Sequence, residues 1–525
     1  MLVMIPRLAS AQFGLFDDPT SIVKSEGLWR GETTLNDDVM YGRFRPVHLA
    51  HFSLIYLAAG SNPFWFFVGN ALIAAVAVAG LVYLVWVATD SSLAAISSGL
   101  AFVLGGPFVE SSFTLSKPEL LQVLWLVLSL VSIAVILKPA SRCRLALGIG
   151  VAAVFVCLAC LTKETAVVLA PISLVWAVVA WLWKRTSESE RGAYGVRRAY
   201  FAAVILGVAT FLVIVLSRVP SILEPAGPRA DFEFNWMHLY SNSRIWADWL
   251  MRDYLYLLPL GVVALMVLFT ERKLQHAHLL VDSVAWMIAW LVIYIPWRYT
   301  PEYYLLPFSI GASVAAGALI SLVVEAGKRK RRLTSLVARG CGVIAGMLFI
   351  LTIPNNASNA GMQLSIDRAN ETAMEYVADN LPLGSTLWFN YRPYEYYWET
   401  ELLLREVLGR QDIHVDQVRY QDLASDFPGE NPLYVLSPVV ENQPYPSVRM
   451  GVYESDARSF EKDLVDRIGP RLKLENEFRA QSKLLTVDAL RLGCLVLRDG
   501  AYCDVPNSPL DTRRFALGWR LYRVE

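Results

Sequence analysis

The sequence predicts an α-helical polytopic membrane protein with about ten or eleven transmembrane helices, followed by a soluble α/β domain. Three observations lead to this prediction. Of the 525 residues, 55% are hydrophobic and only 18% are charged, and the mean hydropathy of +0.40 lies outside the usual range of soluble globular proteins. Apolar runs long enough to cross about 30 Å of hydrocarbon recur along the first two thirds of the chain. After Pro354 the composition changes to mixed polar and apolar.

The N-terminal residues 1 to 16 are apolar but too few to cross a bilayer, and no basic segment precedes them as it would in a signal peptide. We expect the outer end of a helix that begins upstream, or a helix that only dips into the bilayer. Asp17 and Asp18 follow, and Pro19 disfavours helix at Asp18. One interpretation of this acid pair is a helix cap at a solvated loop end.

The stretch from Pro46 to Ala59 is short and contains His48 and His51. We expect a helix lying at the membrane interface, closed by the turn Gly60-Ser61-Asn62-Pro63.

Ten apolar runs of spanning length follow. They are residues 64 to 87, 91 to 109, 120 to 137, 145 to 161, 165 to 183, 199 to 217, 254 to 270, 279 to 297, 303 to 324 and 333 to 353.

Basic residues gather in alternate connections between these runs, at 138 to 144, 184 to 198, 272 to 273 and 328 to 332. The positive-inside rule makes these four loops cytoplasmic. The non-basic loops, the first loop 17 to 63 and the region after 353 then all fall on the other side. We therefore expect a transmembrane domain at 1–353 and an extracytoplasmic α/β domain at 354–525.

Strand-like runs at 385 to 390, 433 to 436 and 492 to 497 alternate with helical patterns at 367 to 380 and 395 to 409, which indicates an α/β domain. Cys494 and Cys503 flank a turn at Arg498-Asp499-Gly500. A two-residue loop would place the two thiols opposite each other for a disulfide, whereas a glycine bulge would shift them out of register.

Other classes of site find no support in the sequence. Lysine plus arginine and aspartate plus glutamate both total 47, so the charge gives no indication of a nucleic-acid partner. The six cysteines form no zinc-type spacing. No glycine-rich nucleotide loop occurs on a cytoplasmic connection.

Ionisable residues instead concentrate at the non-cytoplasmic ends of the predicted spans, where burial is costly and function is a common reason for them. A site that removes a proton and holds a phosphate needs both carboxylates and basic groups. The candidates, with interleaved tyrosines, are Asp17, Asp18, Asp37, Asp38, Arg43, Arg45, Glu110, Lys117, Glu119, Lys163, Glu164, Arg298, Tyr299, Glu302, Tyr303 and Tyr304.

Each motif also has a structural interpretation. Lys163-Glu164 reads as a tight polar turn between two spans, and Lys117-Pro118-Glu119 reads as a helix start with Pro at the first position and Glu in the first turn. We favour this structural interpretation for Glu119. Arg298 could extend to the lipid headgroups between aromatic residues, or face inward as a phosphate clamp.

The order of these motifs resembles the GT-C glycosyltransferases, notably the protein O-mannosyltransferase and aminoarabinose-transferase branch. The resemblance covers about residues 10 to 320. It rests on the acid pair after an apolar helix, Arg45-Pro46 before a short helix, Gly60-Ser61-Asn62-Pro63 before a span with Asn70, "LTKETAVVLAP" at Leu161 to Pro171, and "RYTPEYYLLPF" at Arg298 to Phe308.

The resemblance implies transfer of a hexosyl or pentosyl group, with inversion, from a polyprenyl-phosphate donor to a glycan, lipid or protein acceptor in a bacterial cytoplasmic membrane, as part of cell-envelope glycan chemistry. Asp17 or Asp18 would be the general base; relatives often have Asp-Glu, so the resemblance leaves open which. Lys163, Arg298 and Arg45 would bind the donor phosphate. Glu164 would orient Lys163, with Lys117, Glu119 and Tyr303 in support. Some members use a divalent metal and others do not, and we assign no metal ligand.

Two other classes of function remain open. A multi-span transporter or flippase of a lipid-linked or polar solute also has many spans with charges, although such proteins bind their solute near the midplane. A non-catalytic GT-C-like protein that binds a polymer or a partner is the third candidate.

Overall fold

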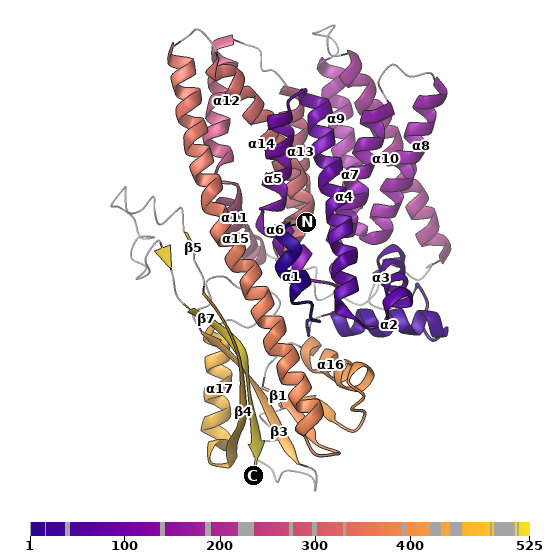
Figure 1. The fold of residues 1–525 in the computed structure, drawn as a ribbon. Helices are drawn as coiled ribbons and strands as arrows, with labels where there is room; N and C mark the ends of the chain where they lie inside the picture. Colours follow the sequence, from indigo (N-terminus) through magenta and orange to yellow (C-terminus); the bar gives the residue numbers. More distant parts are fainter. Residues whose placement is uncertain are drawn as a thin grey trace.

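The computed structural model describes residues 2–15, 17–36, 43–136, 142–183, 191–218, 236–271, 277–296, 302–328, 332–390, 394–418, 432–441, 454–483, 486–487, 510–511 and 514–525. A helical bundle carries a small sheet domain at one of its ends (Figure 1), which we call the domain end. The predicted fold class is confirmed.

The first part of the chain is helical throughout its described residues. Its helices are α1 (Ile5–Ala9), α2 (Asp18–Arg30), α3 (Pro46–Ala59), α4 (Pro63–Thr89), α5 (Ser92–Val103), α6 (Gly106–Phe113), α7 (Glu119–Ile136), α8 (Arg142–Thr162), η3 (Glu164–Val168), α9 (Leu169–Trp183), α10 (Arg191–Arg218), α11 (Trp236–Tyr254), α12 (Leu257–Glu271), α13 (Ala277–Tyr294), η6 (Glu302–Leu305), α14 (Leu306–Gly327) and α15 (Arg332–Asn380).

The chain is an integral membrane protein. Within the described ranges, 5 helices are long and apolar enough to cross a membrane, and two bent helix pairs raise this to 7. One of the pairs is α5 with α6, bent by 55°. Shorter apolar helices, among them α7, α9 and α13, complete the bundle. Each of the ten predicted apolar runs contains a helix.

The helix starts follow from local chemistry. The Asn62 side chain accepts a hydrogen bond from the Phe64 backbone at 3.0 Å, and Pro63 occupies the first turn of α4, where a missing N–H costs nothing. Ser91 caps α5 in the same way. The predicted interfacial helix is α3, which lies beside α2 at the domain end (Figure 1).

Helix α15 runs without a break through 49 residues, about 73 Å at 1.5 Å per residue, far more than a membrane crossing needs. The sequence predicts a domain boundary at 353/354 and a separate helix at 367 to 380, but Pro354 lies inside α15. The polar residues that follow it are buried against α6; Asn356, for example, donates to the Leu104 carbonyl just before that helix. Because these polar residues are buried, the segment after Pro354 is helical, although its composition alone predicts a connection between two domains.

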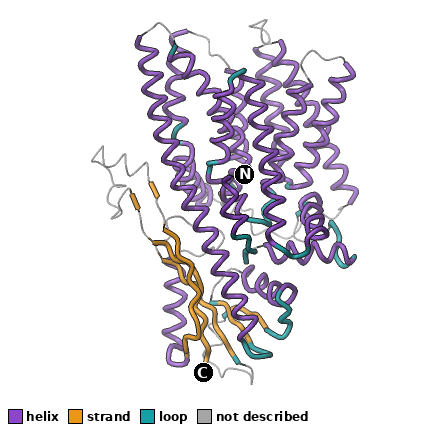
Figure 2. Tube along the Cα trace, viewed as in Figure 1, coloured by secondary structure: helices purple, strands orange, loops and turns teal. Residues whose placement is uncertain are grey.

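The last part of the chain contains a mixed sheet, whose strands are orange in Figure 2. It has five strands in the order β2-β1-β3-β7-β4. Strands β1 and β2 and strands β1 and β3 pair in parallel, and β7 pairs antiparallel with β3 and β4. The elements are β1 (Thr386–Phe389), α16 (Tyr394–Leu402), η7 (Leu403–Val407), β2 (His414–Gln417), β3 (Leu433–Glu441), α17 (Glu454–Ile468), β4 (Leu472–Lys483) and β7 (Arg514–Val524), with a small ribbon of β5 (Thr486–Val487) and β6 (Leu510–Asp511).

Two helices cover the sheet. Alternate residues of β3 point to opposite faces: Leu436 packs in a core with Met374 of α15, and Val435 packs in another with Leu464 of α17. Trp519 of β7 donates a buried hydrogen bond of 2.8 Å to Asn370, which ties the sheet to α15. The predicted strand at 492 to 497 and the pair Cys494 and Cys503 lie outside the described residues.

Candidate functional site

Charged side chains from four separate parts of the chain, with two tyrosines from a fifth, meet at the domain end of the bundle. We call this group the charged cluster. It consists of Asp17, Arg45, Lys117, Glu119, Lys163 and Glu164, with the rings of Tyr303 and Tyr304.

Asp17 has a left-handed backbone, with φ 65°, at the residue before α2. Aspartate tolerates this conformation better than most residues, and the Asp17 side chain makes no capping bond to its own helix. The carboxylate is 43% exposed and pairs with the Lys117 ammonium, which is buried. Burial raises the pKa of Asp17, but the charge and hydrogen bond of Lys117, with the charges of Arg43 and Arg45, outweigh burial and lower that pKa below its ordinary value.

Asp18 differs from Asp17 in its exposure and in its hydrogen-bond partners. Its side chain is 1% exposed. One carboxylate oxygen accepts the Gly14 backbone N–H at 2.8 Å, and the other accepts the Ser116 backbone N–H at 3.1 Å. Asp18 therefore fastens the N-terminal segment to the segment before α7, and Asp17 is the member of the pair that reaches solvent.

Lys163 pairs with Glu119, and the two side chains are only 3% and 0% exposed. The lysine nitrogen lies 4.0 Å from the centroid of the Tyr304 ring. Glu119 is in the first turn of α7, as its structural interpretation predicts. This pair forms the buried floor of the charged cluster.

The resemblance implies that Glu164 orients Lys163, but in the structure Lys163 pairs with Glu119. Lys163 has extended backbone angles, φ −156° and ψ 125°, so consecutive side chains point in opposite directions. Glu164 accordingly accepts the Phe44 backbone N–H at 2.7 Å and lies 3.6 Å from Nε of Arg45. It positions Arg45 instead.

His48 on α3 reports the local electrostatic potential. Its Nδ1 is buried and has no hydrogen-bond partner among the described residues. Burial, then the charge of Arg45, the neighbouring His51 and the charge of Lys117 lower the pKa of His48 to about 3. Burial is the largest cause of this shift, and the positive charges of Arg45 and Lys117 that add to it would attract an anion.

The residues of η6 extend the site. The Tyr303 ring centroid lies 5.2 Å from Nζ of Lys117. The preceding Glu302 turns the other way and pairs with Arg252, which also binds Asp253 at 2.5 Å. Gly106 of α6 leaves room for this second ion-pair group, because a Cβ there would overlap the side chains of Glu302 and Arg252.

Several predicted residues fall elsewhere. Arg298, Tyr299, Asp37 and Asp38 lie outside the described residues. Within the described ranges, no three His, Cys, Asp or Glu side chains come together in a way that could hold a metal ion.

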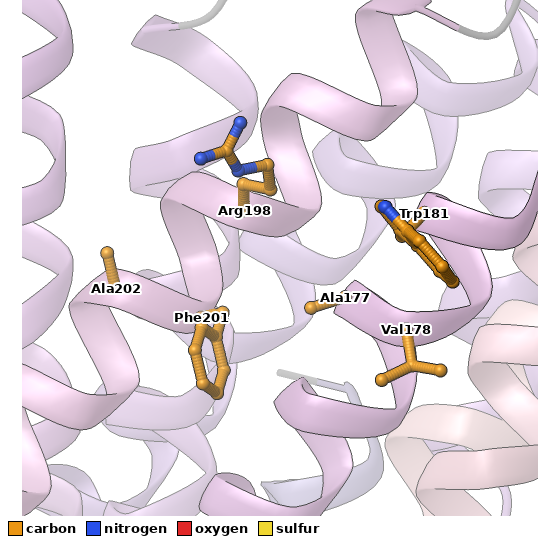
Figure 3. Close-up of a pocket in the computed structure, with 6 residues that line it drawn as sticks. All are labelled: Ala177, Val178, Trp181, Arg198, Phe201 and Ala202. Carbon is orange, nitrogen blue, oxygen red and sulfur yellow. The ribbon is translucent and has the colours of Figure 1, made fainter. Parts of the chain in front are cut away.

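A cavity of about 400 Å³ lies between α9 and α10, lined by Ala177, Val178, Trp181, Arg198, Phe201 and Ala202 (Figure 3). Trp181 is 18 residues after Lys163 along a nearly continuous helix, so this cavity is about 27 Å from the charged cluster. Its lining is mostly apolar; Arg198 is the charged side chain among the lining residues, and they include no carboxylate that could act as a base.

Long-range anchors of the acid pair are not evident in the sequence. Arg7 is fully buried and binds Asp367 of α15 at 2.6 Å, and Gln12 donates to Glu371 at 2.6 Å. Glu399 of α16 receives two hydrogen bonds from Thr20 in the first turn of α2. The one signal in the sequence is Arg7 itself, because an arginine within an apolar segment needs an acidic partner when it is buried.

No family model and no curated protein matches the chain. Among solved structures, it is similar to ArnT from Cupriavidus metallidurans bound to undecaprenyl phosphate, with 12% identity, a TM-score of 0.49, and coverage of 83% of this chain and 91% of that one. It is also similar to the oligosaccharyltransferase of Archaeoglobus fulgidus in the apo form, with 12% identity, a TM-score of 0.48, and coverage of 82% and 66%.

A third similar structure is the arabinofuranosyltransferase AftD from mycobacteria, with 12% identity, a TM-score of 0.42, and coverage of 99% of this chain and 39% of that one. All three are GT-C glycosyltransferases, the group that the sequence motifs resemble. A likeness at this identity concerns the fold alone.

Proposed function

We propose that the chain is a membrane glycosyltransferase that transfers a sugar from a polyprenyl-phosphate donor to an acceptor hydroxyl, with Asp17 as the general base. The observation that carries this proposal is the half-exposed Asp17 carboxylate, held beside Lys117 with Arg45 close enough to lower its pKa. The reaction requires a base next to a phosphate-binding group, and Asp17 and Lys117 are in direct contact.

Asp17 is ionised at neutral pH because its pKa is lowered, so it is ready to accept a proton. A bound donor phosphate competes with Asp17 for the charges of Lys117 and Arg45. Once these charges are shared with the phosphate, the proton affinity of Asp17 rises, and the carboxylate takes the proton of the acceptor hydroxyl as that oxygen attacks the anomeric carbon. The sugar is transferred with inversion, and the phosphate leaves on its lipid.

The other residues have supporting roles in this proposal. The hydrogen bonds of Asp18 fix the backbone next to Asp17, and Glu164 positions Arg45. Lys163 and Glu119 form a neutral floor, and the aromatic rings of Tyr303 and Tyr304 hold the two lysines in place. Arg298 remains a predicted phosphate ligand.

The proposal also covers the side of the membrane on which the charged cluster lies. The predicted cytoplasmic residues Arg144 and Lys328 are at the ends of α8 and α14 opposite the charged cluster. We therefore place the cluster and an α/β domain of residues 354–525 on the outer side of a bacterial cytoplasmic membrane. The acceptor is a glycan, a lipid or a protein that reaches that surface.

Purified protein in proteoliposomes, supplied with radiolabelled sugars on polyprenyl phosphate and with an envelope extract as acceptor, tests the proposal. Asp17→Asn and Lys117→Met should each lower transfer by about 100-fold or more, the typical cost of losing a base or a charge-stabilising donor. Glu32→Gln, an exposed carboxylate just after α2, is the matched control and should keep wild-type activity. Movement of labelled lipid or solute across the bilayer without transfer would contradict the proposal and support a transporter.

A further inference from the structure

The first turn of α2 has an unusual cap. A residue at the N-cap position ordinarily accepts the backbone N–H of the second or third helical residue with its side chain. Asp17 occupies the N-cap of α2 but makes no such bond. The second helical residue is Pro19, which has no N–H, so Thr20 carries the one amide that Asp17 could cap.

That amide is taken by a residue 379 positions away. The Thr20 N–H donates to Oε2 of Glu399 at 3.0 Å, and the Thr20 hydroxyl donates to Oε1 at 2.5 Å. Glu399 is 2% exposed and lies on α16, in the part of the chain that forms the sheet domain. The sheet domain thus caps α2 in place of the helix's own aspartate.

We propose that Glu399 is a positioning residue that keeps Asp17 available for the reaction by occupying its capping position. With Thr20 already bonded, Asp17 gains nothing by turning toward its own helix, and its carboxylate extends to Lys117. Without Glu399 the Thr20 amide has no cap, and we expect the carboxylate of Asp17, the N-cap residue, to take its place. Asp17 would then lose its contact with Lys117 and accept the Thr20 N–H instead.

Electrostatics agree with this geometry. Burial, then the neighbouring charges of Asp17 and Asp18, raise the pKa of Glu399 to about 8, although its bonds from Thr20 act in the opposite direction. Three carboxyl groups therefore share the positive end of one helix, and the mostly protonated, uncharged state of Glu399 at neutral pH limits their mutual repulsion.

Hydrogen–deuterium exchange tests the inference without any activity measurement. In full-length protein in detergent, the Thr20 amide is followed in wild type, Asp17→Ala, Glu399→Ala and the double variant. We expect wild-type protection in Asp17→Ala because Glu399 is the cap, and near wild-type protection in Glu399→Ala because Asp17 takes over. In the double variant exchange should be faster by roughly fivefold or more, the loss expected for a missing cap. Fast exchange in Asp17→Ala alone, or an unchanged double variant, would overturn the inference.

The catalytic consequence rests on the proposed function and is measured separately. Glu399→Ala should lower kcat by about tenfold or more with little change in KM, whereas Glu399→Gln, whose amide oxygen still accepts the Thr20 N–H, should restore most of kcat. In an Asp17→Asn background, Glu399→Ala should cost nothing further, because both changes act through one carboxylate. Glu406→Ala, an exposed carboxylate in η7, is the control. Additive losses would overturn the positioning role, whereas absent transfer in wild type would count against the proposed function and leave the exchange result standing.

Discussion

Lys163→Met should destabilise the protein strongly, because its side chain and that of Glu119 are almost completely buried. Removing the ammonium leaves the Glu119 carboxylate without a counter-ion in the bundle, and its Oε2 already has no hydrogen-bond partner among the described residues. Breaking a buried pair by removing one member costs about 3–5 kcal/mol. The lost contact between the ammonium and the Tyr304 ring at 4.0 Å contributes to that cost.

The double variant Glu119→Gln/Lys163→Met separates this cost from the loss of packing. It removes both charges while keeping the approximate volume of each side chain, so it should regain most of the lost stability, to within about 1–2 kcal/mol of wild type. The free energy of unfolding is measured for all three proteins by titration from a mild detergent into sodium dodecyl sulfate. A single variant as stable as wild type, or a double variant no more stable than the single one, would refute the buried pair. Transfer activity that returns with stability would agree with a supporting role for Lys163, and activity that stays lost would favour a phosphate contact.

Three further predictions concern the acid pair, Gly106 and Glu399. Asp18→Asn should lower the temperature of half-unfolding much more than Asp17→Asn at pH 7, because Asp18 bonds two backbone N–H groups in a buried position; equal effects in a thermal unfolding assay would contradict the distinction between the two acids. Gly106→Ala should destabilise by about 1–3 kcal/mol through overlap with Glu302 and Arg252, whereas Gly150→Ala, where nothing lies within 4 Å of the new Cβ, should be neutral or slightly stabilising. Because the folded pKa of Glu399 lies above its ordinary value of 4.5, at about 8, wild type should lose stability relative to Glu399→Gln as the pH rises from 4.5 to 8; a difference independent of pH would count against a buried, protonated Glu399.

Local patterns predicted much of the candidate site. The candidate site includes Asp17, Lys117, Lys163 and Glu164, because each is an ionisable residue at the end of an apolar run and the alternation of basic loops predicts that all of them lie on one side. The structure brings these residues to one end of the bundle. Their partners were less predictable, because an ion pair depends on side-chain direction: the extended backbone at Lys163 directs it to Glu119 and leaves Glu164 for Arg45.

The choice between Asp17 and Asp18 shows the same limit. Two adjacent aspartates are chemically identical in the sequence, but in the structure the Asp17 side chain is 43% exposed beside Lys117, whereas Asp18 is 1% exposed and accepts two backbone N–H groups. Likewise, the sequence predicts a separate helix at 367 to 380, whereas in the structure these residues continue α15, whose polar residues after Pro354 are buried against α6.

By itself, the sequence determined that the chain crosses a membrane, where its apolar helices lie, and which charged residues gather at one end, because hydrophobic burial and the cost of burying charge act on each segment separately. Only the tertiary structure decided which charges pair, which aspartate faces solvent, and that Glu399 of the sheet domain caps the helix that begins beside Asp17. These outcomes depend on contacts between residues up to 379 positions apart, and no local pattern records them.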